Sequence, residues 1–451
     1  MTGEAAIGER LARAHWLRDH NRHQEAIAEL GSDAGDEPRL ATARAMLAYE
    51  AWLPATAWLE RALVLSPGDR QLVRNLAGSL IGDGRFPAGE ELLVTALAKE
   101  PDWVEGQFAL AQARTTHGAS NADRGFGEAF GLGPMSATLS LAWFQWLAKA
   151  RQWDKARDVL DRAERAYPGH RGMMLSRLFV EAESGASRDP RLFDPAAELG
   201  DPGTDLGRVR HALRLGDPAA VEGIAARHEG QRAGRMFWPY RSLAWRLLGD
   251  DRAAWLERPE IAVCSHDLGY DPAGLARLAD FVRSLHVTAA PQIDQSVRSG
   301  TQTERSILLH HDPIIGELRA RLAIAIDRHI DALPDAVEGH PWLATARTNW
   351  RIAGSWSVRL GPGGHHVPHT HPDGWFSSAL HLALPDTPDG EGALLFGGPP
   401  AELGLELSPT LAVEPVAGVL QLFPSTTWHS TAPIRAGERL TLAFDVAVPH
   451  D

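Results

Sequence analysis

Prolines recur at an almost fixed interval through the first half of the chain. Pro67, Pro101, Pro134 and Pro168 are 34, 33 and 34 residues apart. Before Pro67, Pro101 and Pro168, alanine and leucine recur at three- and four-residue spacing, which is typical of an amphipathic helix. A period in this range indicates a solenoid, in which each repeat packs only against its neighbours. The first half of the chain is therefore expected to be helical.

The repeated segments resemble tetratricopeptide repeats, which are pairs of antiparallel helices. In "LVRNLAGSLIGDGRFPAGEELLVTALAKEP", Ala77 and Gly78 stand where the first helix would cross the second closely, and Phe86 opens the second helix. The resemblance extends from about residue 40 to 180 and weakens toward residue 258. It implies a helical repeat domain, which we expect over residues 1–258.

Charge and cysteine content narrow the classes of partner. The chain has 451 residues and a formal net charge of −13, which argues against nucleic acid or an anionic membrane as a partner, because phosphate binding needs clustered cations. Cys264 is the only cysteine, so no intrachain disulfide can form. The first residues lack the apolar core of a secretory signal, and no run approaches about 18 apolar residues. We expect a cytoplasmic protein without a membrane span.

The sequence pattern changes near residue 259, so a second domain is expected over residues 259–451. Two amphipathic helices are predicted at 271–285 and 313–333, with a polar loop, "QSVRSGTQT", between them. From about residue 350 to 448, short strands alternate with Gly, Pro and Asp, which is typical of a sandwich or barrel. The expected fold class is α + β multidomain: a helical solenoid followed by a β-barrel with flanking helices.

The segment "HVPHTHPDGW" contains a metal-ligand pattern. His369 and His371 project to the same face of a strand, and His429 would arrive from another strand. A close pair with a distant histidine suits a mononuclear iron site, because three ligands on one face leave the remaining positions open. The alternative pair is His371 and Asp373, which would supply the carboxylate of the usual facial triad. Pro372 weakens that alternative, since proline fits only an edge or the end of a strand.

Further polar side chains are expected inside or beside the barrel. Arg439 and Thr441 share one face of a strand whose other face is apolar. A buried arginine needs an anion, and a dicarboxylate that chelates the metal at its other end would supply one. His381 would contact this cosubstrate or the substrate, or would only fill the core. His365 and His366 are expected in a solvated, glycine-rich turn.

Together these segments resemble the 2-oxoglutarate- and Fe(II)-dependent oxygenases, in particular a prolyl-hydroxylase-like family that is often fused to tetratricopeptide repeats. The segments that carry the resemblance are "QSVRSGTQT", "WSVRLGPGGHHVPHTHPDGWFSSA", "GALLF", "VAGVLQLFPSTTWHS" and "GERLTLAF". The resemblance implies a double-stranded β-helix (a jelly-roll), ferrous iron, 2-oxoglutarate and O2, with ascorbate added in assays. It favours His369, His371 and His429 as the iron ligands, with Arg439 and Thr441 on the far carboxylate of 2-oxoglutarate.

The predicted activity is hydroxylation of a C–H bond in a protein or peptide that the concave groove of the helical domain recruits. Two alternatives remain open at this stage. The chain could be a catalytically inactive scaffold or peptide-binding protein, in which the helical domain only forms a homodimer or stabilises the barrel. It could also be a cupin-like metalloprotein with three histidines that does not use 2-oxoglutarate.

Overall fold

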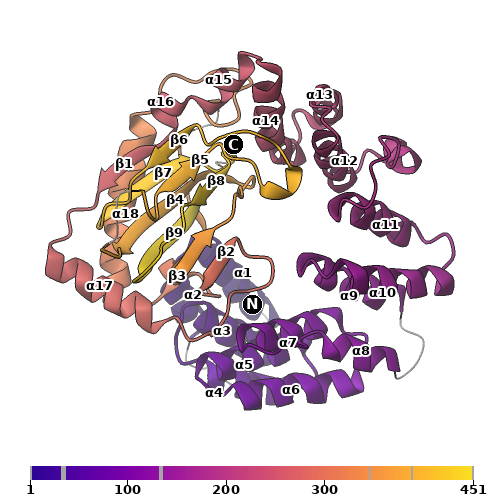
Figure 1. Ribbon diagram of the computed structural model, residues 1–451. Coiled ribbons are helices and arrows are strands. Elements are labelled where there is room, and N and C mark those ends of the chain that lie inside the picture. Colours follow the sequence, from indigo (N-terminus) through magenta and orange to yellow (C-terminus); the bar gives the residue numbers. More distant parts are fainter. Residues whose placement is uncertain (1–2, 32–36, 132–135, 345–346, 387–389, 449–451) are drawn as a thin grey trace.

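The computed structural model describes residues 3–31, 37–131, 136–344, 347–386 and 390–448. Helices dominate the chain as far as Ala262, and the strands and two further α-helices follow (Figure 1). Pro134, one of the four periodic prolines, lies outside the described residues. Within these ranges, no helix is long and apolar enough to cross a membrane.

The helical half consists of short helices that pack in chain order, each against the next. They are α1 (Gly3–Asp19), α2 (His23–Leu30), α3 (Pro38–Glu50), α4 (Thr56–Leu65), α5 (Arg70–Gly82), α6 (Phe86–Lys99), α7 (Val104–Thr116), α8 (Arg124–Gly131), α9 (Ala137–Lys149), α10 (Trp153–Ala166), α11 (Arg171–Glu183), α12 (Pro202–Arg214), α13 (Ala219–Ala225), α14 (Trp238–Leu248), α15 (Arg252–Glu257) and α16 (Pro259–Ala262). The 3-10 helices η2 (Asp194–Leu199), η3 (Ala226–His228) and η4 (Arg232–Phe237) lie between them. We refer to residues 3–262 as the helical arc, because they curve around the sheets (Figure 1).

The periodic prolines mark the same link in successive repeats. Pro67, Pro101 and Pro168 each stand two residues after a helix, namely α4, α6 and α10, and three residues before the next helix begins. Proline stops a helix because it has no N–H and disfavours helical geometry in the residue before it. A repeated link of fixed length turns the chain in the same way each time, and this explains the regular stacking of the arc.

The closest crossing of α5 and α6 is at Gly89. A Cβ atom on Gly89 would lie 2.8 Å from the backbone oxygen of Ala77, so only glycine fits there. Gly78, which we predicted at this crossing, points instead toward α3: a Cβ atom there would lie 2.7 Å from the hydroxyl of Tyr49. Gly89 therefore allows α6 to approach α5 closely, and Gly78 allows the Tyr49 side chain of α3 to approach α5.

A buried ion-pair cluster joins α11 to α12. The Glu183 carboxylate has a side chain only 8% exposed and accepts hydrogen bonds from Arg210 Nε at 2.8 Å and from Arg214. Burial alone would raise the pKa of Glu183, but the hydrogen bonds and charges of Arg210 and Arg214 outweigh it and lower the pKa to about 2. Folding thus favours the ionised form of Glu183. Its contribution to the free energy of unfolding is complete at pH values above the ordinary pKa of a glutamate.

We expect Glu183→Gln to destabilise the protein by about 3 kcal/mol at pH 7, because it leaves buried arginines without their carboxylate. The difference from wild type should shrink as pH falls from about 4.5 and vanish only below pH 2, where wild-type Glu183 is also neutral. Urea unfolding at several pH values measures this. Glu60→Gln, an exposed change on α4, serves as the control. A difference that does not depend on pH would contradict the assignment.

Two antiparallel sheets form the second half. The strands are β1 (Cys264–Asp267), β2 (Val297–Gln302), β3 (Ile352–His366), β4 (Gly374–Ala383), β5 (Leu394–Phe396), β6 (Leu411–Val413), β7 (Val419–Pro424), β8 (His429–Thr431) and β9 (Arg439–Ala447). The larger sheet has the order β1-β7-β4-β9-β3-β2, and the smaller has the order β6-β5-β8. The segment "QSVRSGTQT", expected as a loop, supplies β2, which pairs with β3. Its side chains are polar because β2 is an edge strand.

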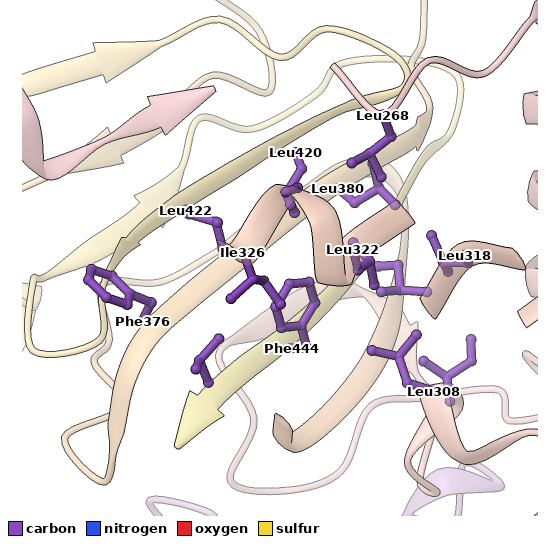
Figure 2. Packing of buried hydrophobic residues seen from close by; sticks show 14 of the residues in the cluster. Leu268, Leu308, Leu318, Leu322, Ile326, Phe376, Leu380, Leu420, Leu422 and Phe444 are labelled. Carbon is purple, nitrogen blue, oxygen red and sulfur yellow. The ribbon is translucent and has the colours of Figure 1, made fainter. Parts of the chain in front are cut away.

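One face of the larger sheet is covered by helices. The sequence prediction of helices here is confirmed, as α17 (Pro272–Ser284) and α18 (Pro313–Asp331). Leu318, Leu322 and Ile326 of α18 pack on leucines of β4, β7 and β9 and on Phe444 (Figure 2). The apolar residues of β9 therefore face these helices, and Arg439 and Thr441, which alternate with them, face the interior between the sheets.

The helical arc touches the sheet half near both of its ends. Near the N-terminal end, Trp52 Nε1 donates to the backbone oxygen of Ser306 at 2.9 Å, and the Arg305 guanidinium stacks 3.8 Å from the Trp52 ring centre. Near the other end, Arg246 of α14 donates to the backbone oxygen of Ser408 at 2.6 Å. These contacts hold the middle of the arc, α9–α12, opposite the edge of the sheets where the histidines lie.

Candidate metal centre

Three histidines converge at one edge of the space between the two sheets. His369, His371 and His429 each offer a ring nitrogen within 4.8 Å of the others, and no other group of this kind occurs in the described ranges. His369 and His429 are backbone partners: each N–H donates to the carbonyl of the other at 3.0 Å. The bridge between these two segments thus brings together residues that are 60 positions apart in the sequence.

Hydrogen bonds fix the orientation of all three rings. Nδ1 lies 2.9 Å from the carbonyl oxygen of Val367 in His369 and 2.9 Å from that of Thr427 in His429. In His371, Nδ1 lies 2.9 Å from the carboxylate oxygens of Asp445. Since these oxygens accept, each Nδ1 carries a proton, which leaves Nε2 as the nitrogen available to a metal; the Ser296 hydroxyl lies 3.3 Å from Nε2 of His369. A proton on Nδ1 gives the tautomer in which a histidine binds a metal through Nε2.

Two of the three histidines, His369 and His429, are also in the protonation state that metal binding requires. Burial, followed by the charge of His371, lowers the pKa of His369 to about 3. Burial likewise lowers the pKa of His429 well below its ordinary value. Both rings are therefore neutral near pH 7, and a cation can bind without first displacing protons.

Asp445 supplies the carboxylate that a three-histidine centre otherwise lacks. It lies on β9 and receives the Nδ1–H of His371, while Ser377 donates to the same carboxylate at 2.6 Å. Sequence reasoning missed Asp445, although it shares a face of β9 with Arg439 and Thr441 at even spacing. A carboxylate behind a metal-binding histidine orients the ring and makes it a stronger donor.

We expect Asp445→Asn to weaken metal affinity by roughly 10- to 100-fold, because the negative charge behind His371 is lost while the side chain keeps its shape. Calorimetric titration of the protein with Ni²⁺ or Fe²⁺ measures this. Asp373→Asn, which removes an exposed carboxylate close to the same histidine, is the matched control and should leave the affinity unchanged. Equal affinities for wild type and Asp445→Asn would contradict the role given to Asp445.

Asp373, the alternative ligand, lies outside the histidine group. Its side chain is 86% exposed and its carboxylate is 3.6 Å from Arg232 of the helical arc. The chain has already turned at this point: the N–H of His371 donates to the carbonyl of Ser425 at 2.8 Å, and that of Gly374 donates to the carbonyl of His371 at 2.9 Å. Asp373 therefore cannot share a strand face with His371, and the geometry favours the set with His369.

The loop after His371 is held by an arginine of the helical arc. Arg235 donates from Nε to the carbonyl oxygen of Pro372 at 2.9 Å, from Nη1 to that of Pro341 at 3.0 Å, and from Nη2 to that of Gly374 at 2.8 Å. Burial lowers the pKa of Arg235, with Asp373 opposing the shift. One side chain thus satisfies three carbonyls and couples the arc to the backbone of a histidine in the cluster.

We expect Arg235→Lys to lower metal affinity by roughly tenfold, because lysine cannot reach all three carbonyls and His371 loses part of its support. The matched control is Arg319→Lys, since Arg319 also donates to two backbone carbonyls, those of Leu308 and His310, away from the histidines. Thermal melting should show a loss of stability in both variants. If Ni²⁺ affinity fell equally in both, the loss of affinity would come from general destabilisation and not from the contacts of Arg235 beside His371.

A buried cavity extends from the histidines between the sheets to Arg439. Thr441 and Ser378 also line it. Arg439 is only 2% exposed, and it has no hydrogen-bond or ion-pair partner among the described residues; its Nε is buried and unsatisfied. Burial lowers the pKa of Arg439 to about 10, so it remains charged at neutral pH. A charged guanidinium without a partner in such a cavity fits an anionic ligand that reaches from the metal to Arg439.

Of two further histidines near this cavity, His366 lines it and His381 does not. His381 is fully buried on β4, but it is not among the residues that line the cavity. His366, expected in a solvated turn, lies instead at the end of β3 and lines the cavity, with Nδ1 2.8 Å from the Ser296 hydroxyl. The strand extends further than its glycine-rich sequence indicated, because β2 pairs with its end at His365 and His366. His365, the neighbouring residue, also lies in β3 and is only partly exposed, with Nδ1 3.0 Å from the carbonyl oxygen of Gly363, so the prediction of a solvated turn is wrong for both histidines.

Comparison with known proteins gives one family match. Residues 354–445 match the family described as "Putative 2OG-Fe(II) oxygenase". A comparison with curated proteins gives no match. Similar solved structures include a prolyl-4-hydroxylase from Pseudomonas putida, with 17% identity over 42% of this chain and 94% of that chain, at a TM-score of 0.30.

Two further solved structures are similar at the same level. A viral collagen prolyl hydroxylase from Paramecium Bursaria Chlorella virus-1, in complex with 2OG, has 12% identity over 42% of this chain and 97% of that chain, with a TM-score of 0.30. HygX from Streptomyces hygroscopicus, with nickel, 2-oxoglutarate and hygromycin B bound, has 11% identity over 42% of this chain and 83% of that chain, with a TM-score of 0.30.

The matched residues contain the histidine cluster, Asp445 and the buried Arg439. The donor set fits a ferrous ion, because imidazole nitrogens suit iron and three of them leave positions open for a chelating cosubstrate. The unsatisfied Arg439 fits the second carboxylate of 2-oxoglutarate. The family match and the histidine triad thus support Fe(II) and 2-oxoglutarate as cofactors, and residues 354–445 are similar to a 2OG-Fe(II) oxygenase.

Proposed function

We propose that the protein is a 2-oxoglutarate- and Fe(II)-dependent dioxygenase that hydroxylates a C–H bond of a protein or peptide. The observation that carries this proposal is the cavity itself. It connects three histidines, which can each offer Nε2 to a metal, to an arginine that has no partner among the described residues. When bound, ferrous iron and 2-oxoglutarate supply the activation of O2 that hydroxylation requires.

The chain's own residues would each have a definite part. His369, His371 and His429 would hold the metal, and Asp445 would orient His371. Arg439 and Thr441 would bind the far carboxylate of 2-oxoglutarate and so fix its rotation. Apolar side chains on the cavity wall, Leu394 and Phe423 among them, would exclude bulk water from the reacting groups.

The proposal also gives a separate role to each half of the chain. Residues 1–258 would form a tetratricopeptide-like repeat domain that recruits the substrate, and residues 259–451 would form the oxygenase domain on a double-stranded β-helix. An open cleft supports this arrangement, because its walls come from α9–α12 on one side and from His369 and His371 on the other. A substrate in the cleft would contact the arc and the metal centre together.

Succinate formation tests the proposal. The protein is incubated with ferrous iron, ascorbate, O2 and 2-oxoglutarate, with a peptide library present or absent, and succinate is measured. We expect metal-dependent succinate from wild type and none from His429→Ala. Since some oxygenases turn over only with substrate, binding of 2-oxoglutarate to the Ni²⁺-loaded protein is measured in parallel. Absence of both succinate and metal-dependent 2-oxoglutarate binding would favour an inactive scaffold.

A further inference from the structure

A continuous groove leads from the helical arc to the metal centre. The cleft at His369 and His371 has a volume of about 640 Å³. A second cavity, of about 450 Å³, extends toward residues 115–123 at the end of α7. The two adjoin because they share four lining residues: Lys149, Arg151, Ile293 and Arg298. Together they exceed the size usual for a small-molecule site, which is about 300 to 1,000 Å³.

Of the three cations shared by both cavities, one lacks a carboxylate. Lys149 pairs with Asp294 at 2.7 Å, and Arg151 pairs with Glu402. Arg298 donates only to two backbone carbonyls of its own segment, and no carboxylate of the described residues lies within ion-pair distance of it. In a chain of net charge −13, this leaves a positive charge in the groove where the rest of the protein is acidic. Such a charge favours an anionic group on the ligand.

The backbone beside Arg298 adopts an unusual conformation. Ser299, which follows Arg298, has φ 52°. The pairing of β2 with β3 also shifts register between Arg298 and Gly300, which is a β-bulge. Left-handed backbone in residues other than glycine, and bulges that redirect a side chain, are concentrated at binding and active sites. Both features direct attention to Arg298.

The spacing between Arg298 and the metal centre suits an extended peptide. The Ser296 hydroxyl is 3.3 Å from Nε2 of His369. Arg298 is two residues further along an extended segment, a span of about 7 Å, which places it roughly 10 Å from the metal centre. An extended peptide covers that distance in roughly three residues. Trp153, Trp356 and Phe179, which is 41% exposed, offer apolar surface in the same cleft.

We propose that the groove binds an extended polypeptide segment in which an aspartate or glutamate pairs with Arg298, roughly three residues from the residue that is modified. This rests on the function proposed above and adds the class of substrate: an acidic segment, not a basic or neutral one. The α9–α12 face of the arc and the edge strand β2 would hold the segment between them.

Three fluorescein-labelled peptides of equal length, in which alanine alternates with Glu, Gln or Lys, test the assignment by fluorescence anisotropy on the full chain. We expect the Glu peptide to bind at least about fivefold more tightly than the Gln and Lys peptides. Arg298→Gln should remove that advantage, and Arg298→Glu should reverse it in favour of the Lys peptide. The matched control is Arg359→Glu, a charge reversal on β3 outside the groove, which should change neither preference.

Free glutamate is the competitor that separates a polypeptide from a small acid. We expect it not to displace the Glu peptide at matched carboxylate concentration. Equal binding of the Glu and Lys peptides to wild type, or a preference that survives Arg298→Glu, would overturn the proposal. Because the readout does not depend on turnover, succinate formation without a preference for the Glu peptide rejects only the groove assignment. A preference for the Glu peptide, with neither succinate nor metal-dependent binding of 2-oxoglutarate, rejects the hydroxylase and keeps the groove.

Discussion

His429→Ala is expected to bind ferrous iron or Ni²⁺ more than about 100-fold more weakly than wild type. This loss exceeds the one expected for Asp445→Asn or Arg235→Lys, which change only residues that support the ligands. The reason is that His429 supplies one of only three nitrogens that converge, and its Nε2 faces His369 and His371. His371→Ala should behave in the same way. Calorimetric titration with Ni²⁺ measures the affinity, and succinate formation follows activity.

Two controls make this result specific. His365→Ala removes a nearby, partly exposed histidine that does not line the cavity, and it should keep both affinity and activity. Asp373→Ala removes the carboxylate that a conventional triad would use, and it should also keep both, because the carboxylate is exposed and turned toward Arg232. Loss of metal on Asp373→Ala, with His369→Ala unaffected, would instead establish the pair His371 and Asp373 as ligands.

Arg439→Met is the second change with a large expected effect, and it should act in opposite directions on two quantities. Affinity for 2-oxoglutarate should fall by about 100-fold, equivalent to about 3 kcal/mol, because the far carboxylate loses a buried charged partner. The stability of the ligand-free protein should stay the same or rise, because the variant replaces an unpaired buried charge by an apolar side chain.

Thermal melting with and without 2-oxoglutarate, in the presence of Ni²⁺, measures both quantities in one experiment. Arg359→Met is the matched control: Arg359 lies on the neighbouring strand, is half exposed and pairs with Glu438. It should alter neither the stability of the ligand-free protein nor the shift that 2-oxoglutarate produces. An unchanged shift in Arg439→Met would favour the cupin-like metalloprotein, which holds metal through three histidines without 2-oxoglutarate.

Much of the architecture follows from local sequence patterns. The proline period predicted a helical first half, because a helix stop at fixed spacing constrains every link in the same way. Alternation along β9 predicted that Arg439 and Thr441 face away from the apolar core, because successive side chains of a strand point to opposite faces. The set of His369, His371 and His429 was likewise one of two that the spacing allowed.

The remaining features depend on contacts that no spacing reveals. Whether Asp373 or His369 joins the other histidines depends on a turn fixed by Ser425 and Arg235, which lie far from it in the sequence. Asp445 meets His371 across 74 residues of chain, so the carboxylate behind the histidine could not be identified from a local motif.

By itself, then, the sequence determined the helical half, most of the strands after residue 350, the choice of metal-binding residue types and the faces of β9, since each depends on periodicity along a single element. Only the tertiary structure decided which histidines converge, which carboxylate supports them, and that the middle of the arc lies across a groove from the metal centre. Those outcomes depend on the packing of elements that are distant in sequence, where a single backbone turn or strand pairing moves a side chain into or out of the site.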